Sequence, residues 1–190
     1  FAQMSPDRFV KKVLLETCCA KGVVVGPDFH FGHKRSGNIE TLRGWGTRER
    51  FSVELVPPVM HGGEAVSSTR IRRVLREEGD VEDVARMMTR LHELSGVVVR
   101  GDQRGREIGF PTANLEIGPL QLPKDGVYSV FARLLDEPGS ALLDGVANLG
   151  VRPTFGAGRS LEVHLFGFDG ELYGKRMRIG FASRIRGEAK

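Results

Sequence analysis

The spacing of apolar residues changes character near residue 92 and divides the chain into two parts. Before this point, segments with helical spacing alternate with short apolar runs of the kind found in strands. After it, β-rich runs at 96–99, 127–134, 161–168 and 176–181 are separated by glycine and proline turns. The pattern predicts an α/β part followed by an all-β domain, with the boundary near residues 90–94 and no long linker.

The first part begins with a helix and a strand. Ser5 and Pro6 suit the N-cap and the first helical position, and the helix is expected to end before Gly22. The apolar run 23–25 then predicts a fully buried parallel strand. Residues 26–37 are expected to form the loop that follows this strand.

A second set of elements completes the α/β part. The pattern predicts a short helix over 36–43 and a strand over 51–56. Ser67 precedes a further helix that stops at Gly79, and Asp80 caps the next one.

Composition narrows the class of protein. The 190 residues are 40% hydrophobic and carry 28 basic against 24 acidic side chains, so the chain is globular with a net charge of +4, which suits an anionic partner. Its two cysteines, Cys18 and Cys19, are adjacent and poorly placed to bridge each other, which indicates a reducing compartment. No apolar run approaches the roughly 20 residues that a membrane span needs. We expect a cytoplasmic protein with no membrane partner.

The glycine-rich segment 101–114, GDQRGREIGFPTAN, is the first candidate for a ligand site. Its glycines let backbone N–H groups approach phosphate oxygens, and its arginines add paired donors for the same anion. Thr112 and Asn114 can offer oxygen atoms to a hard cation such as Mg²⁺. From these residues alone, a glycine-rich turn with solvated arginines is the alternative.

A series of motifs in order resembles the riboflavin kinase family over about residues 92–190. They are the segment 101–114, LPKDGVYSV at 122–130, GVANLGVRPTFG at 145–156, LEVHLF from 161, and ELYGK up to 175. The resemblance implies a six-stranded antiparallel barrel. It also implies transfer of the γ-phosphate of ATP to the ribityl 5′-hydroxyl of riboflavin, which gives FMN.

The resemblance also implies roles for individual residues. Thr112 and Asn114 would ligate the Mg²⁺ that bridges the nucleotide phosphates. The residues expected around the ATP phosphates are Gly105, Arg106, Gly109 and Thr112.

Glu162 would be the catalytic base. A carboxylate within hydrogen-bond reach of a hydroxyl can take its proton as phosphoryl transfer proceeds. The strand period of two places Leu161, Val163 and Leu165 on one face and Glu162, His164 and Phe166 on the other, so a merely solvated Glu162 is the alternative. No role is assigned to His164.

Asn148 and Arg152 are candidates for the flavin or nucleotide pocket. As polar turn residues they could equally satisfy the backbone. Gly167 stands where the family usually has an aspartate, and we expect only a local effect from this departure.

Two segments of the first part resemble the C-terminal half of the FMN adenylyltransferase domain that precedes riboflavin kinase in bifunctional bacterial enzymes. They are GPDFHFGHKRSG at 26–37 and SSTRIR at 67–72. Loops after a buried strand and helix starts are both places where α/β proteins bind anionic ligands. The resemblance implies Asp28, Phe29 and Arg35 near flavin or phosphate, and Ser67, Ser68, Thr69, Arg70 and Arg72 near ATP. An ordinary capped helix with exposed arginines is the alternative for the second segment.

We therefore expect a partial, Rossmann-like adenylyltransferase domain over 1–91 and a kinase barrel over 92–190 without its C-terminal helices. Nothing in residues 1–25 matches the family's HxGH-type motif, so this chain is expected not to make FAD, whereas an intact parent would. ATP, riboflavin and FMN are the expected small-molecule ligands, with Mg²⁺ as cofactor. A non-catalytic flavin- or nucleotide-binding fragment is the alternative. A nucleic-acid binder is disfavoured because the arginines of 70–76 are helix-spaced and mixed with glutamates, and stacking aromatics are absent.

Overall fold

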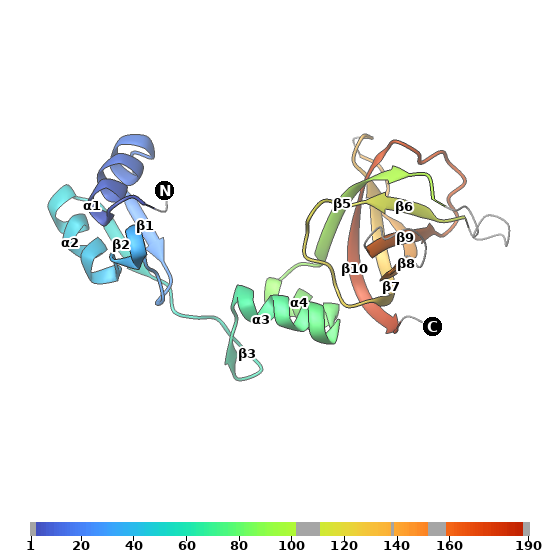
Figure 1. Ribbon diagram of the computed structural model, residues 1–190, viewed down its shortest axis with the longest axis horizontal. Coiled ribbons are helices and arrows are strands. Elements are labelled where there is room, and N and C mark those ends of the chain that lie inside the picture. Colours follow the sequence, from blue (N-terminus) through green and yellow to red (C-terminus); the bar gives the residue numbers. More distant parts are fainter. Residues whose placement is uncertain (1–2, 102–110, 138, 152–158, 188–190) are drawn as a thin grey trace. The chain divides into compact units, whose positions relative to one another are not determined.

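The structure is a computed structural model that describes residues 3–101, 111–137, 139–151 and 159–187. The chain divides into two compact units, Phe1–Val66 and Ser67–Lys190, which are described separately (Figure 1). The first unit contains α1 (Pro6–Arg8), η1 (Phe9–Thr17), β1 (Gly22–Val25), η2 (His33–Arg35), α2 (Ile39–Glu49), β2 (Ser52–Leu55), β3 (Met60–His61) and β4 (Glu64–Ala65).

The first unit is an α/β layer, as the sequence predicts. Ser5 caps α1 by accepting a hydrogen bond from the backbone N–H of Arg8, and the chain runs on into η1. Strands β1 and β2 pair in parallel. The predicted full burial of the first strand is wrong, since Val25 is buried but Val24 is 63% exposed. The apolar cluster formed with η1 and α2 covers only the Val25 face of this two-stranded sheet.

The second helix of this unit was placed too early by the sequence pattern. It runs from Ile39 to Glu49 because Asn38, and not Ser36, is its N-cap: the Asn38 side chain accepts from the backbone N–H of Thr41 at 2.9 Å. The helix ends at Arg50, whose φ of 60° lies in the left-handed region.

The second unit begins with α3 (Ser68–Arg73), η3 (Val74–Glu78) and α4 (Val81–Met88), and its caps are those the sequence predicts. The Ser67 hydroxyl accepts from the backbone N–H of Arg70, and the Asp80 carboxylate from that of Asp83. Helix η3 ends at Glu78, and Gly79 follows with a φ of 74°, a left-handed conformation that glycine adopts without strain.

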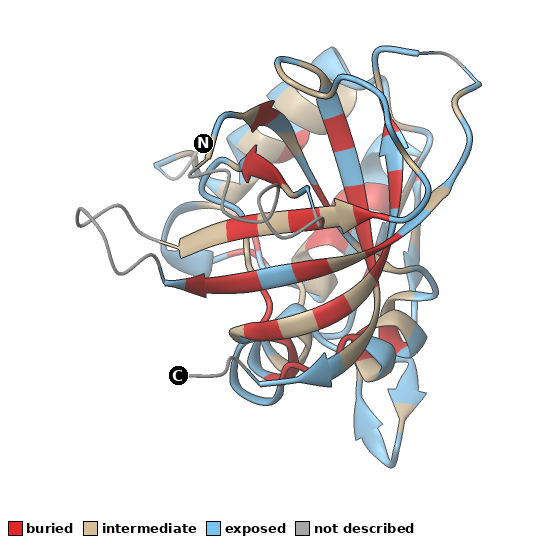
Figure 2. Ribbon diagram, turned by 90° about the vertical axis from the view of Figure 1, so that its right-hand side faces the viewer, coloured by how far each residue is buried: buried red, intermediate tan, exposed pale blue. Residues whose placement is uncertain are grey.

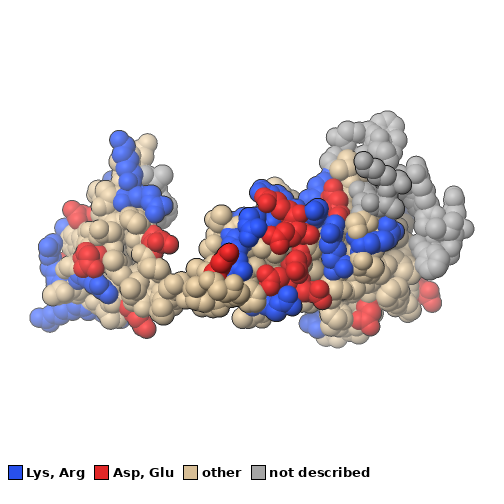
Figure 3. All heavy atoms as spheres, turned by 90° about the horizontal axis from the view of Figure 1, so that it is seen from below, with Lys and Arg blue, Asp and Glu red and all other residues tan. Residues whose placement is uncertain are grey.

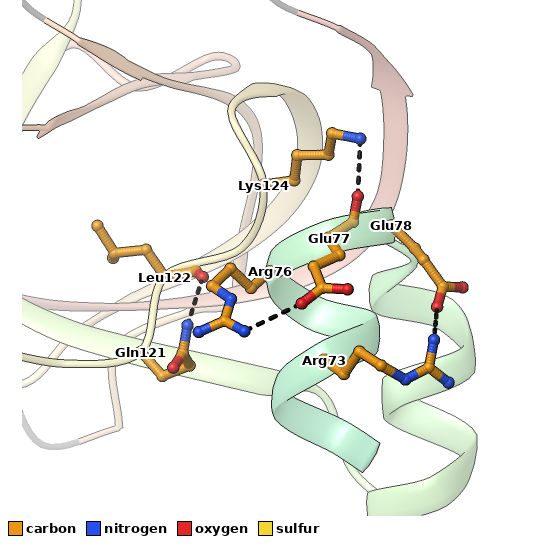
Figure 4. Close-up of polar contacts among 7 residues, drawn as sticks. All are labelled: Arg73, Arg76, Glu77, Glu78, Gln121, Leu122 and Lys124. Carbon is orange, nitrogen blue, oxygen red and sulfur yellow. Dashed lines mark hydrogen bonds and ion pairs between the residues drawn. The ribbon is translucent and has the colours of Figure 1, made fainter. Parts of the chain in front are cut away.

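These helices pack with the barrel. Helix α4 packs on β5 (His92–Val99) and β10 (Arg176–Arg186). At the end of η3, the backbone N–H of Lys124 donates to the Leu75 carbonyl at 2.9 Å, and its ammonium donates to the Glu77 carbonyl at 2.7 Å (Figure 4). By packing, the second unit therefore starts at Ser67, earlier than residue 92. The predicted division of the sequence into an adenylyltransferase part at 1–91 and a kinase part at 92–190 stays a prediction.

A closed antiparallel barrel of six strands forms the rest of the second unit, which confirms the expected architecture. The strands follow the order β10-β5-β6-β9-β8-β7 around the barrel, and β10 pairs with both β5 and β7 to close it. The remaining strands are β6 (Ala113–Glu116), β7 (Gly126–Leu134), β8 (Leu143–Val151) and β9 (Arg159–Leu165). Burial alternates along β7 and β9, and Figure 2 shows the banding of the strands, so every second side chain of these two strands points into the barrel. Among the described residues, no helix is long and apolar enough to cross a membrane.

His92 makes the stability of the second unit depend on pH. Its ring lies 5.9 Å from that of Phe181, and its Nε2–H donates to the Gln121 carbonyl at 3.0 Å. Burial lowers the pKa of His92 below its usual value, against a smaller opposing effect of the Gln121 contact. Between this lowered pKa and about pH 6.5, the unfolded chain binds more protons than the folded one, so the unit loses stability as pH falls through this window.

We expect His92→Gln to flatten this dependence, because glutamine can still donate to the carbonyl but does not titrate. In the window, the wild type should lose up to about 1.4 kcal/mol per pH unit relative to the variant. Urea unfolding followed by tyrosine absorbance at pH 7.5, 6.0 and 5.0 measures the difference. Parallel curves for the two proteins would contradict the assignment to His92.

Candidate functional site

Three residues that the sequence singled out lie in one row across neighbouring strands of the barrel. Glu162 on β9 is opposite Asn114 on β6 and opposite Asn148 on β8. Paired residues of an antiparallel sheet project to the same face with their Cβ atoms about 5 Å apart. Leu161 and Val163, the neighbours of Glu162, are fully buried in the barrel, so the row lies on its outer face. The predicted division of this strand into two faces is confirmed.

The environments of the three side chains differ. Asn114 is 5% exposed and is the one buried polar residue among those described. A Cβ atom at Gly101 would lie 2.1 Å from the Asn114 amide nitrogen, so glycine there lets the backbone rest against this side chain. Glu162 is half-buried, and within the described residues its carboxylate has no hydrogen bond or ion pair. It is therefore available to an external donor. Asn148 is exposed, and it lies on β8 rather than in the turn that the sequence suggested.

Thr112, two residues before Asn114 in the chain, lines a cavity of about 440 Å³. The inward-facing side chains of three strands form one wall, and the segment 168–173 forms the other. The size falls within the usual range for small-molecule sites, roughly 300–1,000 Å³. The lining residues are Val98, Pro111, Thr112, Ala113, Val163, Leu165, Phe168, Asp169, Gly170, Glu171, Leu172 and Tyr173. The motif ELYGK overlaps the end of this second wall, although no site residue was predicted within 168–173.

One hydrogen bond within the segment 168–173 and one just after it fix this segment, which lines the cavity. The Tyr173 N–H donates to the Glu171 carboxylate at 3.1 Å, and the Gly174 N–H donates to the Val98 carbonyl at 2.8 Å. Gly167, the departure from the family pattern, has a φ of 64°, a conformation in which glycine carries no steric penalty. The local effect expected of this departure stays a prediction.

His164, to which the sequence assigned no role, connects β9 with the segment that carries Thr112. Its Nδ1 lies 2.9 Å from the carbonyl oxygen of Pro111, which can only accept, so Nδ1 carries the hydrogen. The His164 ring also packs edge-on against Phe166 with centroids 5.6 Å apart.

A polar cluster fixes the N-terminal end of β9. Arg159 donates to the Asp125 carboxylate and to the Pro123 carbonyl, and Arg184 donates to the Asp125 carbonyl at 2.9 Å. Tyr128 donates its hydroxyl to the Lys124 carbonyl. Burial raises the pKa of Tyr128, with the two arginines opposing the shift. Arg159 thus fixes the strand three residues before Glu162.

Four of the predicted site residues, Gly105, Arg106, Gly109 and Arg152, lie outside the described residues.

In the first unit, the three residues expected near flavin or phosphate share one loop. His30 connects two of them, with its Nδ1 at 2.9 Å from the Asp28 carbonyl and at 3.1 Å from the Arg35 guanidinium. Nδ1 can donate to the carbonyl or accept from the arginine, but not both at once. Phe29 is half-buried and stacks on Phe31 at 5.5 Å, and Asp28 and Arg35 are exposed. The sequence analysis missed His30.

The residues expected near ATP all belong to the second unit. Ser67 caps α3, Ser68, Thr69 and Arg72 are exposed, and Arg70 is half-buried. The structure therefore contains the capped helix with exposed arginines that was the alternative for this segment. The loop with Asp28, Phe29 and Arg35 belongs to the first unit.

Comparison with protein families identifies the barrel. The family model for riboflavin kinase matches residues 88–190, more than half of the chain. The chain belongs to the riboflavin kinase family. The model for FAD synthetase matches residues 1–70, which contain the Asp28–Arg35 loop and the start of α3.

Curated relatives of this riboflavin kinase family member carry both activities in their names. A bifunctional riboflavin kinase/FMN adenylyltransferase from Haemophilus influenzae is 36% identical over 191 residues, and that from Escherichia coli K12 is 35% identical; each alignment spans all of this chain. The chain spans about three fifths of the length of these relatives.

A solved structure also matches the whole chain. It is described as that of a macrolide-efflux protein from Streptococcus pneumoniae, with a TM-score of 0.84, 30% identity and 60% of that chain covered. This description names a different activity from the names of the curated relatives, and it applies to that protein.

Thr112 and Asn114, the residues expected to ligate Mg²⁺, fit an ion that takes most of its ligands from a bound nucleotide and water. Within the described part of the chain, no group of three or more His, Cys, Asp or Glu side chains is arranged to hold a metal. Thr112 and Asn114 supply a hydroxyl and an amide oxygen, and Mg²⁺ commonly takes a few protein oxygens together with substrate phosphates and water. The donor set is therefore suited to Mg²⁺ bound with a nucleotide.

Proposed function

We propose that this protein phosphorylates riboflavin to FMN with ATP and Mg²⁺. The observation that carries the proposal is the row of Asn114, Glu162 and Asn148 on the outer face of the barrel, two residues along the chain from Thr112, which lines the cavity. In this row the Glu162 carboxylate, which has no hydrogen bond or ion pair within the described residues, is paired across the ladder with Asn114. The family membership of residues 88–190 supports the same reaction.

In this proposal each residue has a separate task. Glu162 accepts the proton of the riboflavin 5′-hydroxyl as that oxygen attacks the γ-phosphorus of ATP. Thr112 and Asn114 hold the Mg²⁺, which neutralises charge on the phosphates when it is bound. The cavity beside Thr112 takes the nucleoside end of ATP, and Asn148, exposed on the other side of Glu162, orients the flavin.

The direct test is to incubate the protein with ATP, Mg²⁺ and riboflavin and to measure FMN and ADP by chromatography. Formation of both in equal amounts supports the kinase. Quenching of riboflavin fluorescence without FMN formation would instead support the alternative, a non-catalytic flavin-binding fragment.

We further propose that residues 1–70 belong to the FMN adenylyltransferase part of a bifunctional parent. The FAD synthetase match and the names of the relatives support this. We place the protein in the cytoplasm, which its two free, exposed cysteines support.

The arginines of α3 and η3 do not present an isolated basic surface. Arg73 pairs with Glu78 and Arg76 with Glu77 (Figure 4). In the view of Figure 3, acidic and basic side chains lie next to one another over the second unit. We propose small molecules, and not nucleic acid, as its ligands.

Thr112→Val is expected to raise the Mg²⁺ concentration for half-maximal FMN formation about tenfold, the equivalent of losing ~1.4 kcal/mol of binding. Valine keeps the branched shape but has no oxygen for the metal. Thr112→Ser keeps the hydroxyl and serves as the control, with a Mg²⁺ dependence close to that of the wild type. Steady-state rates over a Mg²⁺ titration measure both. Equal titration curves for Val and Ser would remove Thr112 from the metal site.

A further inference from the structure

His164 lies between the strand that carries the proposed base, Glu162, and the segment that carries the proposed metal ligand, Thr112. Its side chain leaves β9 two residues after Glu162, on the same outer face. Its Nδ1–H reaches the Pro111 carbonyl, one residue before Thr112. One side chain therefore connects the strand of the proposed base with the segment of the proposed metal ligand.

The backbone does not make this connection by itself. The ladder between β6 and β9 covers only Ala113, Asn114 and Leu115, which pair with Val163, Glu162 and Leu161. Pro111 lies beyond the last pair, and it has no N–H with which to continue the ladder. The His164 side chain contacts the Pro111 carbonyl at the point where backbone pairing ends.

Neighbouring side chains restrict the orientation of the His164 ring. His164 lies edge-on to Phe166, and it pairs across the ladder with Val146 on β8. A carbonyl oxygen accepts only, so the ring donates from Nδ1 both when it is neutral and when it is protonated. The contact does not depend on a change of protonation state.

We propose that His164 is a positioning residue of the kinase site: its Nδ1–H holds the Pro111 carbonyl and so fixes Thr112 and Asn114 relative to Glu162. The inference rests on the proposed function. Its consequence is that loss of the donor affects the binding of MgATP more than that of riboflavin. A displacement of about 1 Å at such a site is enough to cost roughly 100-fold in rate.

The test compares His164→Phe, which keeps a ring but has no donor, with His164→Asn, whose amide nitrogen can replace Nδ1. We expect the Phe variant to raise KM for MgATP about tenfold, with KM for riboflavin within about twofold, and the Asn variant to restore most of the loss. Phe131→Ala, which truncates an exposed side chain on β7, is the control and should leave both constants unchanged. The pH profile of kcat/KM should keep its shape in the Asn variant, whereas a proton-transferring His164 would lose one limb.

Hydrogen exchange separates this inference from the proposed function. In the peptide covering residues 111–117, the Phe variant should exchange about tenfold faster than the wild type, and the Asn variant and Phe131→Ala at nearly the wild-type rate. If the wild type makes no FMN but exchange responds in this way, the kinase proposal fails and the positioning contact stands. Unchanged exchange in the Phe variant, or no rescue by Asn, overturns the positioning role.

A measurement on the unmodified protein covers the case in which the Phe variant does not fold. The ¹⁵N spectrum of the histidine side chains should show His164 with its hydrogen on Nδ1 and in slow exchange with water. A His164 ring with its hydrogen on Nε2 would overturn the proposal.

Discussion

Glu162→Gln is expected to lower kcat for FMN formation by about 10²- to 10⁴-fold, the usual contribution of a general base. Glutamine has nearly the same shape and keeps one acceptor oxygen, but it cannot take the proton of the riboflavin hydroxyl. Because Glu162 has no hydrogen bond or ion pair within the described residues, its replacement breaks no contact there, and we expect KM for MgATP to stay within about twofold. Steady-state kinetics of the purified variant measure both constants.

Glu116→Gln is the matched control for this experiment. Glu116 is an exposed carboxylate on β6, two residues after Asn114, so its replacement removes the same charge from a neighbouring strand. We expect its kcat to equal that of the wild type. Equal losses in the two variants would point to a general effect of charge, and an unchanged rate for Glu162→Gln would show that another group takes the proton.

The sequence predicted those parts of the fold that depend on local chemistry. The cap residues Ser67 and Asp80 and the stop at Gly79 are correct, because a hydroxyl, a carboxylate and a glycine act within one turn of the chain. The burial of Leu161 and Val163 against Glu162 is also correct, since period two is a property of the strand itself.

The sequence was less informative where partners distant in the chain decide the structure. Val24 lies in an apolar run that predicts full burial, but its exposure depends on which faces of the sheet other elements cover. Residues 113–116 and 145–151 read as parts of a loop and a turn, and they are strands because the barrel pairs them with β9. Short runs rich in glycine, asparagine and alanine carry little β signal of their own.

The candidate site shows the same division. The resemblance to a family supplied Asn114, Glu162 and Asn148 from three separate motifs, and only the register of β6, β8 and β9 shows that they form one row. His164 was passed over because a single strand histidine gives no signal in sequence. Its significance comes from the Pro111 carbonyl, 53 residues earlier in the chain.

Phe181→Ala is expected to destabilise the second unit by about 3–5 kcal/mol, the largest stability loss among the changes proposed for this protein. The ring is fully buried and meets Tyr128 edge-on, with centroids 5.3 Å apart. Truncation leaves a cavity between β10 and its two neighbouring strands, which are already paired on both sides and cannot close over it. For a urea m-value near 2 kcal/mol/M, the unfolding midpoint should fall by roughly 2 M.

The chain provides separate probes for its two units, so the loss can be assigned to one of them. Trp45, the single tryptophan, is buried in the core of the first unit, whereas both tyrosines, Tyr128 and Tyr173, belong to the second. In Phe181→Ala, the transition followed by tyrosine absorbance should shift while the one followed by Trp45 fluorescence stays in place. Leu42→Ala, which removes a fully buried side chain from the Trp45 cluster, should produce the reverse pattern. If either substitution moved both transitions by the same amount, the two cores would unfold as one cooperative unit, and the separate hydrophobic clusters would not be independently stable.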